Sequence, residues 1–289
     1  MKWRRARRSS NVEDRRGARP GGLGGGIGRL GLGGVIAVLA IGLLLGRSPM
    51  EMLGLVGQLD GGQQAGAPAA GPGEDDESRR FVEAILGETE DVWAAHFAAS
   101  GNRYQPPVLV LFTGRVTSAC GSATAAVGPF YCPEDRQVYI DLSFFQEMQR
   151  SLGGGGDFAE AYVIAHEVGH HVQHLTGATR LVGQARASGR DVAGADGLLV
   201  RQELQADCYA GVWAHAAQQR HGWLEPGDIE EALATASAIG DDHLQREAQG
   251  TVVPDSFTHG TAAQRTRWFR SGYEHGDPGR CDTFAADRL

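Results

Sequence analysis

Two histidines and a glutamate near the middle of the chain have the types and spacing needed to hold a metal ion beside a base. His166, Glu167 and His170 form the pattern His-Glu-x-x-His within residues 157–177, which are predicted to form one helix. Because four residues make about one helical turn, the two imidazoles lie on one face, roughly 6 Å apart along the axis, and can bind one Zn²⁺. Glu167 is turned by about 100° and lies beside the ion, where it can accept a proton from water.

A second pair of carboxylates strengthens this interpretation, because His-Glu-x-x-His alone also occurs by chance. Glu203 and Asp207 lie four residues apart in residues 198–219, which are predicted to be helical, so both carboxylates lie on one face. Glu203 is predicted to be the third zinc ligand, and Asp207 is predicted to hydrogen-bond His166 and fix its orientation. The alternative is that both patterns are solvated charges on helix surfaces; their joint occurrence favours one metal site.

The sequence also predicts which elements position these residues. Asp157 follows four glycines and is predicted to cap the first helix, with Glu160 completing a capping box and Gly177 ending the helix. The glycine-rich residues 183–197 are predicted to be a mobile connection to the second helix. Apolar patterns predict further helices at 79–100 and 228–238, and strands at 107–112 and 137–141. The expected fold class is therefore α+β, mainly helical with a small sheet.

Charge is distributed unevenly along the chain. The first 47 residues hold 10 Lys and Arg against 2 Asp and Glu, and the remaining residues hold 17 against 33, a formal charge of −16. A domain this acidic repels phosphate backbones, so nucleic acid is excluded as a partner. Residues 1–29 carry arginines among glycine and serine without an apolar period, and they are predicted to be a disordered, basic cytoplasmic tail.

An uncharged, apolar stretch follows the basic tail. Residues 30–46 contain no charged side chain and are predicted to form one transmembrane anchor, short and rich in glycine. The positive-inside rule then places the N-terminus in the cytoplasm and the remaining chain outside. A cleaved signal peptide is the rival interpretation; the long basic segment before the stretch and Arg47-Ser48-Pro49 after it disfavour cleavage. Residues 47–78, rich in Gly, Pro and Gln, are predicted to be a flexible linker to a domain at 79–289.

Several motifs in chain order give the sequence a specific resemblance. Those motifs are Ala119-Cys120-Gly121, Gly128-Pro129-Phe130-Tyr131-Cys132-Pro133, His166-Glu167-Val168-Gly169-His170-His171-Val172-Gln173, Glu203-Leu204-Gln205-Ala206-Asp207-Cys208, Phe257-Thr258-His259-Gly260 and Cys281-Asp282-Thr283-Phe284. The two helical motifs resemble the gluzincin class of zinc peptidases, and the chain as a whole is similar to a bacterial family of neutral zinc metallopeptidases over residues 79–284. This resemblance implies a zincin-like domain that binds one Zn²⁺ and acts on a peptide or protein; it does not supply a particular substrate.

The resemblance also suggests roles for a loop histidine and a strand. His259 lies in one of the shared motifs, in a loop before residues 262–269, which are predicted to be helical. It could donate a hydrogen bond to the oxyanion formed during hydrolysis, or it could hold its own loop through backbone hydrogen bonds; the sequence leaves both roles open. In zincins the strand before the metal helix is a sheet edge on which an extended peptide lies, and by position residues 138–141 are expected to be that strand. His174 shares the ligand face but is about 12 Å beyond His166, too far to bind the same ion.

Four cysteines fit an oxidising compartment outside the membrane. Of the three possible pairings we favour Cys120 with Cys132, which closes a short loop, and Cys208 with Cys281, which ties the C-terminal end to the residue after Asp207. No Cys-x-x-Cys pair occurs, and three positions around the metal are already filled by histidine and glutamate. The cysteines are therefore not expected to bind zinc.

Together these observations predict a membrane-anchored zinc metallopeptidase. Zinc is held by His166, His170 and Glu203, an activated water attacks the peptide carbonyl, and Glu167 is the general base that passes the proton to the leaving amine. One alternative is an inactive extracytoplasmic binding module that zinc only stabilises; Glu167 argues against it, because a structural zinc site needs no base. Another alternative is a zinc hydrolase that cleaves amides other than peptides.

Overall fold

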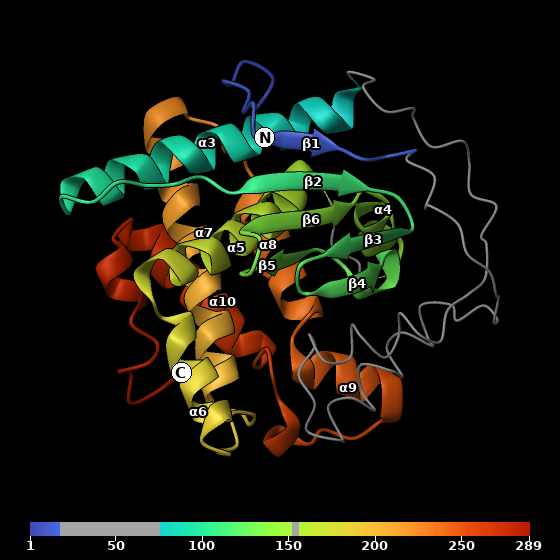
Figure 1. Cartoon of the computed structure of the whole chain (residues 1–289), viewed down its shortest axis with the longest axis vertical. Helices are drawn as coiled ribbons and strands as arrows, with labels where there is room; N and C mark the ends of the chain where they lie inside the picture. Colours follow the sequence, from blue (N-terminus) through green and yellow to red (C-terminus); the bar gives the residue numbers. More distant parts are fainter. Residues whose placement is uncertain (18–75, 152–155) are drawn as a thin grey trace.

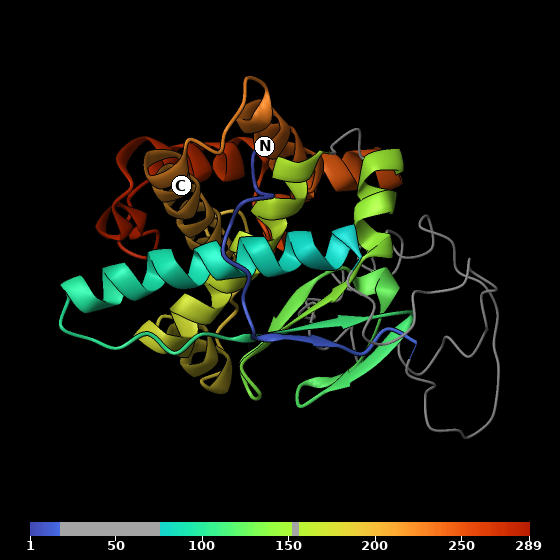
Figure 2. The same cartoon turned by 90° about the horizontal axis from the view of Figure 1, so that it is seen from above.

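The computed structural model describes residues 1–17, 76–151 and 156–289. In this part of the chain, helices pack against a small sheet that lies along one side of the molecule (Figures 1 and 2). The predicted fold class, α+β and mainly helical, is confirmed at this level. The helices and strands run in the following order: β1 Val12–Asp14, α3 Glu77–Ala99, β2 Val108–Phe112, β3 Arg115–Ser118, β4 Gly121–Thr124, β5 Phe130–Cys132, β6 Gln137–Asp141, α4 Ser143–Ser151, α5 Asp157–Thr176, α6 Thr179–Ala187, α7 Leu198–His221, α8 Asp228–Ala238, α9 Asp241–Gln249 and α10 Ala262–His275.

The main sheet has four strands in the order β1-β2-β6-β5. β1, β2 and β6 are parallel, and β5 is antiparallel to β6. β2 is apolar along its whole length because both of its faces are covered. Leu109 and Leu111 pack with the helices, whereas Val110 and Phe112 pack with Val116 and its neighbours in the β3–β4 hairpin. The alternation along one strand therefore separates the main core from a smaller one.

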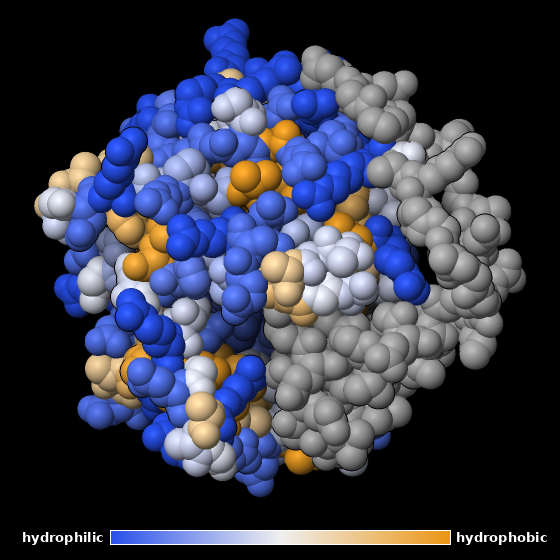
Figure 3. All heavy atoms as spheres, in the orientation of Figure 1, coloured by the Kyte–Doolittle hydropathy of each residue, from blue (hydrophilic) through white to orange (hydrophobic). Residues whose placement is uncertain are grey.

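The helices bury their apolar side chains in the main core. Figure 3 shows a mainly hydrophilic face with small, separated apolar patches. Among the described residues Leu181 is the one large hydrophobic side chain that is exposed. Burial of nearly all of these side chains is the main source of stability for a domain of this size.

The prediction of a disordered tail is wrong for residues 1–17, which are part of the fold. β1 pairs in parallel with β2, and Trp3 is 5% exposed, in edge contact with Phe81 on α3. The Trp3 indole N–H donates to Asp157 at the first turn of α5, at 2.8 Å. Only a few apolar residues make these contacts, too few for a periodic pattern.

Most arginines of this segment are paired with carboxylates. Arg7 contacts Glu90 and Asp91 on α3, each at 2.8 Å, and the buried Arg16 bridges Asp14 and Asp76 at 2.6 Å. Some of these partners lie more than 60 residues away in the sequence, so the pairing leaves no local pattern. Residues 1–17 therefore belong to the same fold as the residues from 76 onward, where Asp76 caps α3.

The sequence predicts the C-terminal end of the metal helix α5 correctly and its N-terminal cap incorrectly. Gly177 is the C-cap in the left-handed conformation, as expected. The N-cap is Gly156 and not Asp157, so the predicted capping box with Glu160 is wrong. Asp157 is the first helical residue, and its carboxylate accepts the Trp3 indole N–H. A partner from the distant N-terminus has replaced the local cap. Part of the predicted mobile connection, residues 183–187, is also helical, in α6.

The docking of residues 1–17 bears on the predicted membrane topology. Because β1 and β2 share a sheet, residues 1–17 and 76–289 lie on the same side of any membrane in this structure. A single crossing between them would separate the two. Residues 30–46 and most of the linker, 47–75, lie outside the described residues. Within the described ranges no helix is long and apolar enough to cross a bilayer. The transmembrane anchor at residues 30–46 stays a prediction. A single membrane crossing there is incompatible with residues 1–17 packing against the domain as they do in this structure.

Replacing Trp3 tests whether the N-terminal segment is docked in solution. We expect Trp3→Ala to lower the free energy of unfolding by about 3–5 kcal/mol, the usual loss when a buried aromatic side chain is removed. Arg5→Ala is the control, because Arg5 is an exposed neighbour and its loss should change stability by less than about 0.5 kcal/mol. Urea denaturation followed by circular dichroism measures both. Wild-type stability in the Trp3 variant would show that the segment is detached.

Candidate metal centre

The metal centre lies where α5 packs against α7. Gly169 on α5 faces Ala206 on α7, and a Cβ atom added at Gly169 would lie 3.1 Å from the Ala206 Cα. Any larger side chain at Gly169 would push the helices apart. The two small residues thus allow the His-Glu-x-x-His face of one helix to lie directly against the carboxylates of the other.

Three side chains converge at this contact. The Nε2 atoms of His166 and His170 lie 3.2 and 3.5 Å from the same oxygen of Glu203, Oε2. The ligand atoms of the three residues all lie within 4.8 Å of one another. The predicted ligand set is therefore brought together by the fold, with two nitrogen donors and one oxygen donor facing one point.

Each histidine is oriented through its other ring nitrogen. The Nδ1–H of His166 donates to Asp207 at 2.9 Å, the partner predicted from the sequence. His170 donates from Nδ1 to the Oε1 of Gln173, also at 2.9 Å. Gln173 is fixed in turn by the Gln202 carbonyl and by Gln205. Both imidazoles therefore present the Nε2 lone pair to the cluster, the arrangement found in metal-binding histidines.

Asp207 is fully buried and holds a larger network than the sequence indicated. Its carboxylate accepts hydrogen bonds from the Tyr162 hydroxyl at 2.5 Å and from the Arg265 guanidinium at 2.8 and 2.9 Å. Burial would raise the pKa of Asp207, but the charges of Arg265 and His166 outweigh it and lower this pKa to about 2. Sequence reasoning missed Arg265, because it lies on α10, 58 residues after Asp207. The spacing of three residues from His170 could have identified Gln173.

Glu167 lies next to the cluster without joining it. It is 8% exposed, on the same helix as the two histidines but outside the converging set. Burial raises the pKa of its carboxyl group, and the neighbouring His170 and His166 oppose that rise. Its position agrees with the role of a base that faces the site and does not bind the ion.

His259 lies close enough to Glu203 to interact with its charge and is held by Asp241. The Asp241 carboxylate accepts the backbone N–H groups of Thr258, His259 and Gly260 and also contacts His259 Nδ1 at 3.2 Å. Burial would lower the pKa of His259, but Asp241, and then Glu203, outweigh it and raise this pKa. Asp241 thus holds the loop through backbone hydrogen bonds and contacts His259 at Nδ1, whereas the role of His259 toward an oxyanion stays a prediction.

The remaining histidines of the motif lie outside the cluster. His171 is fully buried, donates to the Gln105 carbonyl at 2.6 Å and accepts from the Tyr131 hydroxyl at 3.0 Å. Burial lowers its pKa to about 4, which keeps it neutral. His174 lies one turn beyond His170, beside the Tyr131 ring at 6.3 Å between centroids.

The sheet edge nearest the metal helix is β5, so the expectation for residues 138–141 is wrong. Those residues belong to β6, which lies between β2 and β5. The chain reaches the edge first, in β5, and then turns back into the sheet as β6. Tyr131 on β5 contacts His171 and thereby sets β5 beside α5.

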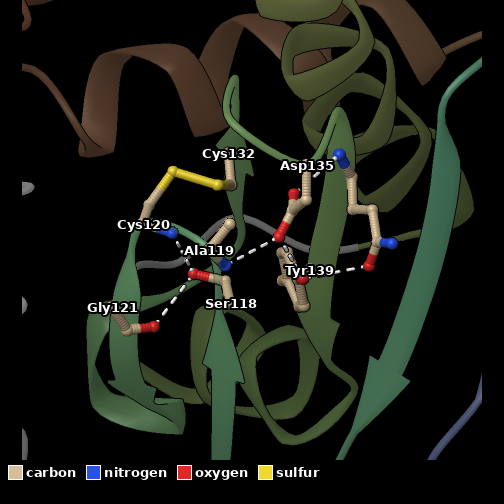
Figure 4. The surroundings of a disulfide bond; sticks show 8 residues. Ser118, Ala119, Cys120, Gly121, Cys132, Asp135 and Tyr139 are labelled. Carbon is tan, nitrogen blue, oxygen red and sulfur yellow. Dashed lines mark hydrogen bonds between the residues drawn. A yellow bond between two sulfur atoms is a disulfide. The ribbon is translucent and has the colours of Figure 1, made fainter.

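Both favoured disulfides are present. Cys120–Cys132 joins the start of β4 to β5, and nearby Asp135 accepts the Ala119 backbone N–H (Figure 4). Cys208–Cys281 ties α7 to the turn after α10. Gln205 supports the same turn by donating to the Cys281 carbonyl at 2.9 Å. The second bridge therefore fixes the helix that carries Glu203 and Asp207.

Comparison with known proteins agrees with the geometry of this site. A family model described as "Putative neutral zinc metallopeptidase" matches residues 1–284. The chain is 49% identical over 287 residues to the uncharacterized protein YpfJ of Escherichia coli strain K12, covering 98% of this chain and 99% of that protein. It is 46% identical over 223 residues to the uncharacterized protein Rv2575 of Mycobacterium tuberculosis, covering 74% of each. No solved structure matches. The chain belongs to the neutral zinc metallopeptidase family.

Proposed function

We propose that this protein is a zinc-dependent peptidase that hydrolyses peptide bonds in peptides or proteins. The observation that carries the proposal is the convergence of His166, His170 and Glu203 within 4.8 Å, with the buried carboxyl group of Glu167 beside them. We assign this domain to the zincin-like folds on the same grounds, because it combines a His-Glu-x-x-His helix with a glutamate helix.

The residues present fit one zinc ion. Two imidazole nitrogens and a carboxylate oxygen are common zinc ligands, and both imidazoles are held by hydrogen bonds in the tautomer that binds a metal. Three protein ligands leave a position open, as in catalytic sites. A bound Zn²⁺ would supply a Lewis acid and a water whose pKa is about 7.

Glu167 is the general base and then the general acid. Its carboxylate takes a proton from the attacking water and gives that proton to the nitrogen of the leaving amine. Burial raises its pKa toward the working range of a proton-transferring group. A site that only stabilises a fold has no use for such a group, which is why a peptidase is favoured over a zinc-stabilised binding module. Hydrolysis of amides other than peptides would use the same residues, and substrate profiling separates the two.

His259 is the group that stabilises negative charge on the substrate carbonyl oxygen. Asp241 contacts its Nδ1, so in the protonated ring the Nε2–H is the donor that remains for this role. The Glu203 carboxylate raises the pKa of His259, and His259 lowers that of Glu203, so the two side chains lie close enough to interact.

The compartment is also part of the proposal. Two disulfides favour a location outside the cytoplasm, where they persist. The apolar residues 30–46 support attachment to a membrane. The docked residues 1–17 would then lie in the same compartment as the site.

Variants of the two glutamates separate the base from the ligand. We expect Glu167→Gln to keep one zinc per chain and to lower kcat/KM at least about 100-fold, because the side chain stays polar but can no longer accept a proton. Glu203→Ala leaves two histidines and should lose zinc and activity together. Metal analysis after dialysis, with cleavage of an unfolded protein mixture, measures both. A wild-type protein that binds one zinc and cleaves no peptide in a broad library would refute the peptidase.

Asp207→Asn tests the carboxylate that orients His166. The variant keeps the shape of the side chain but removes its charge, and we expect zinc affinity to fall by roughly 10–100-fold with the three ligands intact. Competition with a coloured chelator measures the dissociation constant. Asp135→Asn, beside the Cys120–Cys132 bridge, is the control and should not change zinc affinity. Unchanged affinity in the Asp207 variant would remove that residue from the metal site.

The pH dependence of activity reports on His259. Its folded-state pKa is raised above the ordinary value of 6.5, so the protonated, donating form persists at pH 6.5 and is lost as pH rises through the raised pKa. We expect kcat/KM of the zinc-loaded enzyme to fall on that alkaline limb. In His259→Gln the limb should vanish and kcat/KM near pH 6.5 should be lower by about 100-fold. An unchanged pH profile in this variant would leave His259 with the loop role alone.

A further inference from the structure

A hollow of about 580 Å³ lies beyond the metal centre, past the C-terminal half of α5. Its wall comes from three parts of the chain: the connection between α3 and β2, the turn between β5 and β6, and the last turn of α5. Arg103 and Gln105 belong to the connection, Arg136 to the turn, and His174 to α5. Phe97 and Leu175 also line it.

This hollow is cationic on a domain that is otherwise acidic. Arg103 and Arg136 are both exposed, and among the described residues neither forms an ion pair with a carboxylate. Arg136 donates instead to the neutral Gln105 side chain at 3.0 Å. Burial lowers the pKa of His174. The positive charges of Arg136 and Arg180 lower it further, and the charge of Glu134 opposes them. The arginines of residues 1–17, by contrast, are largely paired with carboxylates.

The backbone at Arg136 supports a role for its side chain. Arg136 has φ 58°, and among the described residues it is the only one other than glycine with a positive φ. Glycine would adopt this conformation without strain, so an arginine here makes the turn less stable than it could be. Strained positions of this kind cluster at sites that bind ligands.

The hollow lies in line with the metal centre. His174 is on the ligand face of α5, one turn beyond His170 and two turns beyond His166, which is about 6–12 Å along the helix. His174 also lies beside Tyr131 on the edge strand β5. An extended peptide advances about 3.3 Å per residue. A chain that follows β5 from the metal centre therefore reaches His174, and the hollow that His174 lines, after roughly two to four residues.

We propose that this hollow is a subsite that binds a carboxylate of the peptide substrate, two to four residues from the bond that is cleaved. Arg103 and Arg136 bind the carboxylate, because guanidinium groups match its geometry and form charge-assisted hydrogen bonds with it. The carboxylate comes from a Glu or Asp side chain or from the C-terminus of a short peptide. This inference rests on the proposed peptidase and adds a substrate class to it.

The experiment compares peptides of about a dozen residues that differ by one group. One series moves a single Glu along an otherwise neutral sequence, with Gln as its partner at each position; the other compares a free C-terminal acid with the amide. The full chain is used as wild type, Arg103→Ala, Arg136→Gly and Arg136→Glu. Arg270→Ala is the matched control, because Arg270 is also exposed but does not line the hollow. Binding is measured in the zinc-loaded Glu167→Gln background by fluorescence anisotropy, and kcat/KM with the active base.

We expect the carboxylate peptide to be favoured at least about tenfold, in binding and in kcat/KM, at one position of the Glu series or in the free-acid pair. Arg103→Ala and Arg136→Gly should bring the ratio close to 1, and Arg136→Glu should favour the uncharged member of the pair, because the new carboxylate repels that of the peptide. Arg136→Gly should melt no lower than wild type, because glycine relieves the positive φ. Arg270→Ala should keep the wild-type ratio.

A binding ratio near 1 for every pair, or a preference that survives in the Arg103 and Arg136 variants, would overturn the subsite. A wild-type chain that discriminates in binding but cleaves nothing would refute the peptidase and leave the carboxylate site standing.

Discussion

The buried carboxylate of Asp207 joins the three helices on which the site depends. It lies on α7 and accepts hydrogen bonds from Tyr162 and His166 on α5 and from Arg265 on α10. A fully buried charge is strongly destabilising unless it is paired, and here one guanidinium and two further donors satisfy it. The network therefore specifies how the helices pack as well as which way His166 points.

The metal helix α5 is positioned at three levels along its length. Its first residue, Asp157, is held by Trp3 from the N-terminal segment. Its middle touches α7 at Gly169, where an added Cβ atom would lie only 3.1 Å from the Ala206 Cα. Its last turns are held through His171 by the chain before β2 and by β5. A site on an element fixed at three levels is preorganised for the ion and the substrate.

The sequence predicted local features well and distant partners poorly. His166, His170, Glu203 and Asp207 could be found because helical spacing puts their side chains on facing surfaces, and the helix end at Gly177 follows from the backbone freedom of glycine. The last strand along the chain, β6, has the predicted bounds, Gln137–Asp141. The position of β6 inside the sheet was not predicted, because strand order depends on the direction in which the chain turns after β5. Arg265 and the docking of Trp3 gave no signal, because their partners are far away in the sequence.

The pairing of β1 with β2 also determines when the fold can be completed during synthesis. The first residues leave the ribosome before any of their partners exist, because the backbone N–H of Lys2 binds the carbonyl of Trp223, and Val12 pairs with Leu109. Contacts this distant form late, after the loop-closure entropy has been overcome. Until these contacts form, β2 has no partner strand on the side where β1 pairs with it, and the place of Trp3 beside Phe81 is empty. Once docked, residues 12–14 cover an edge of β2 that could otherwise pair with another chain.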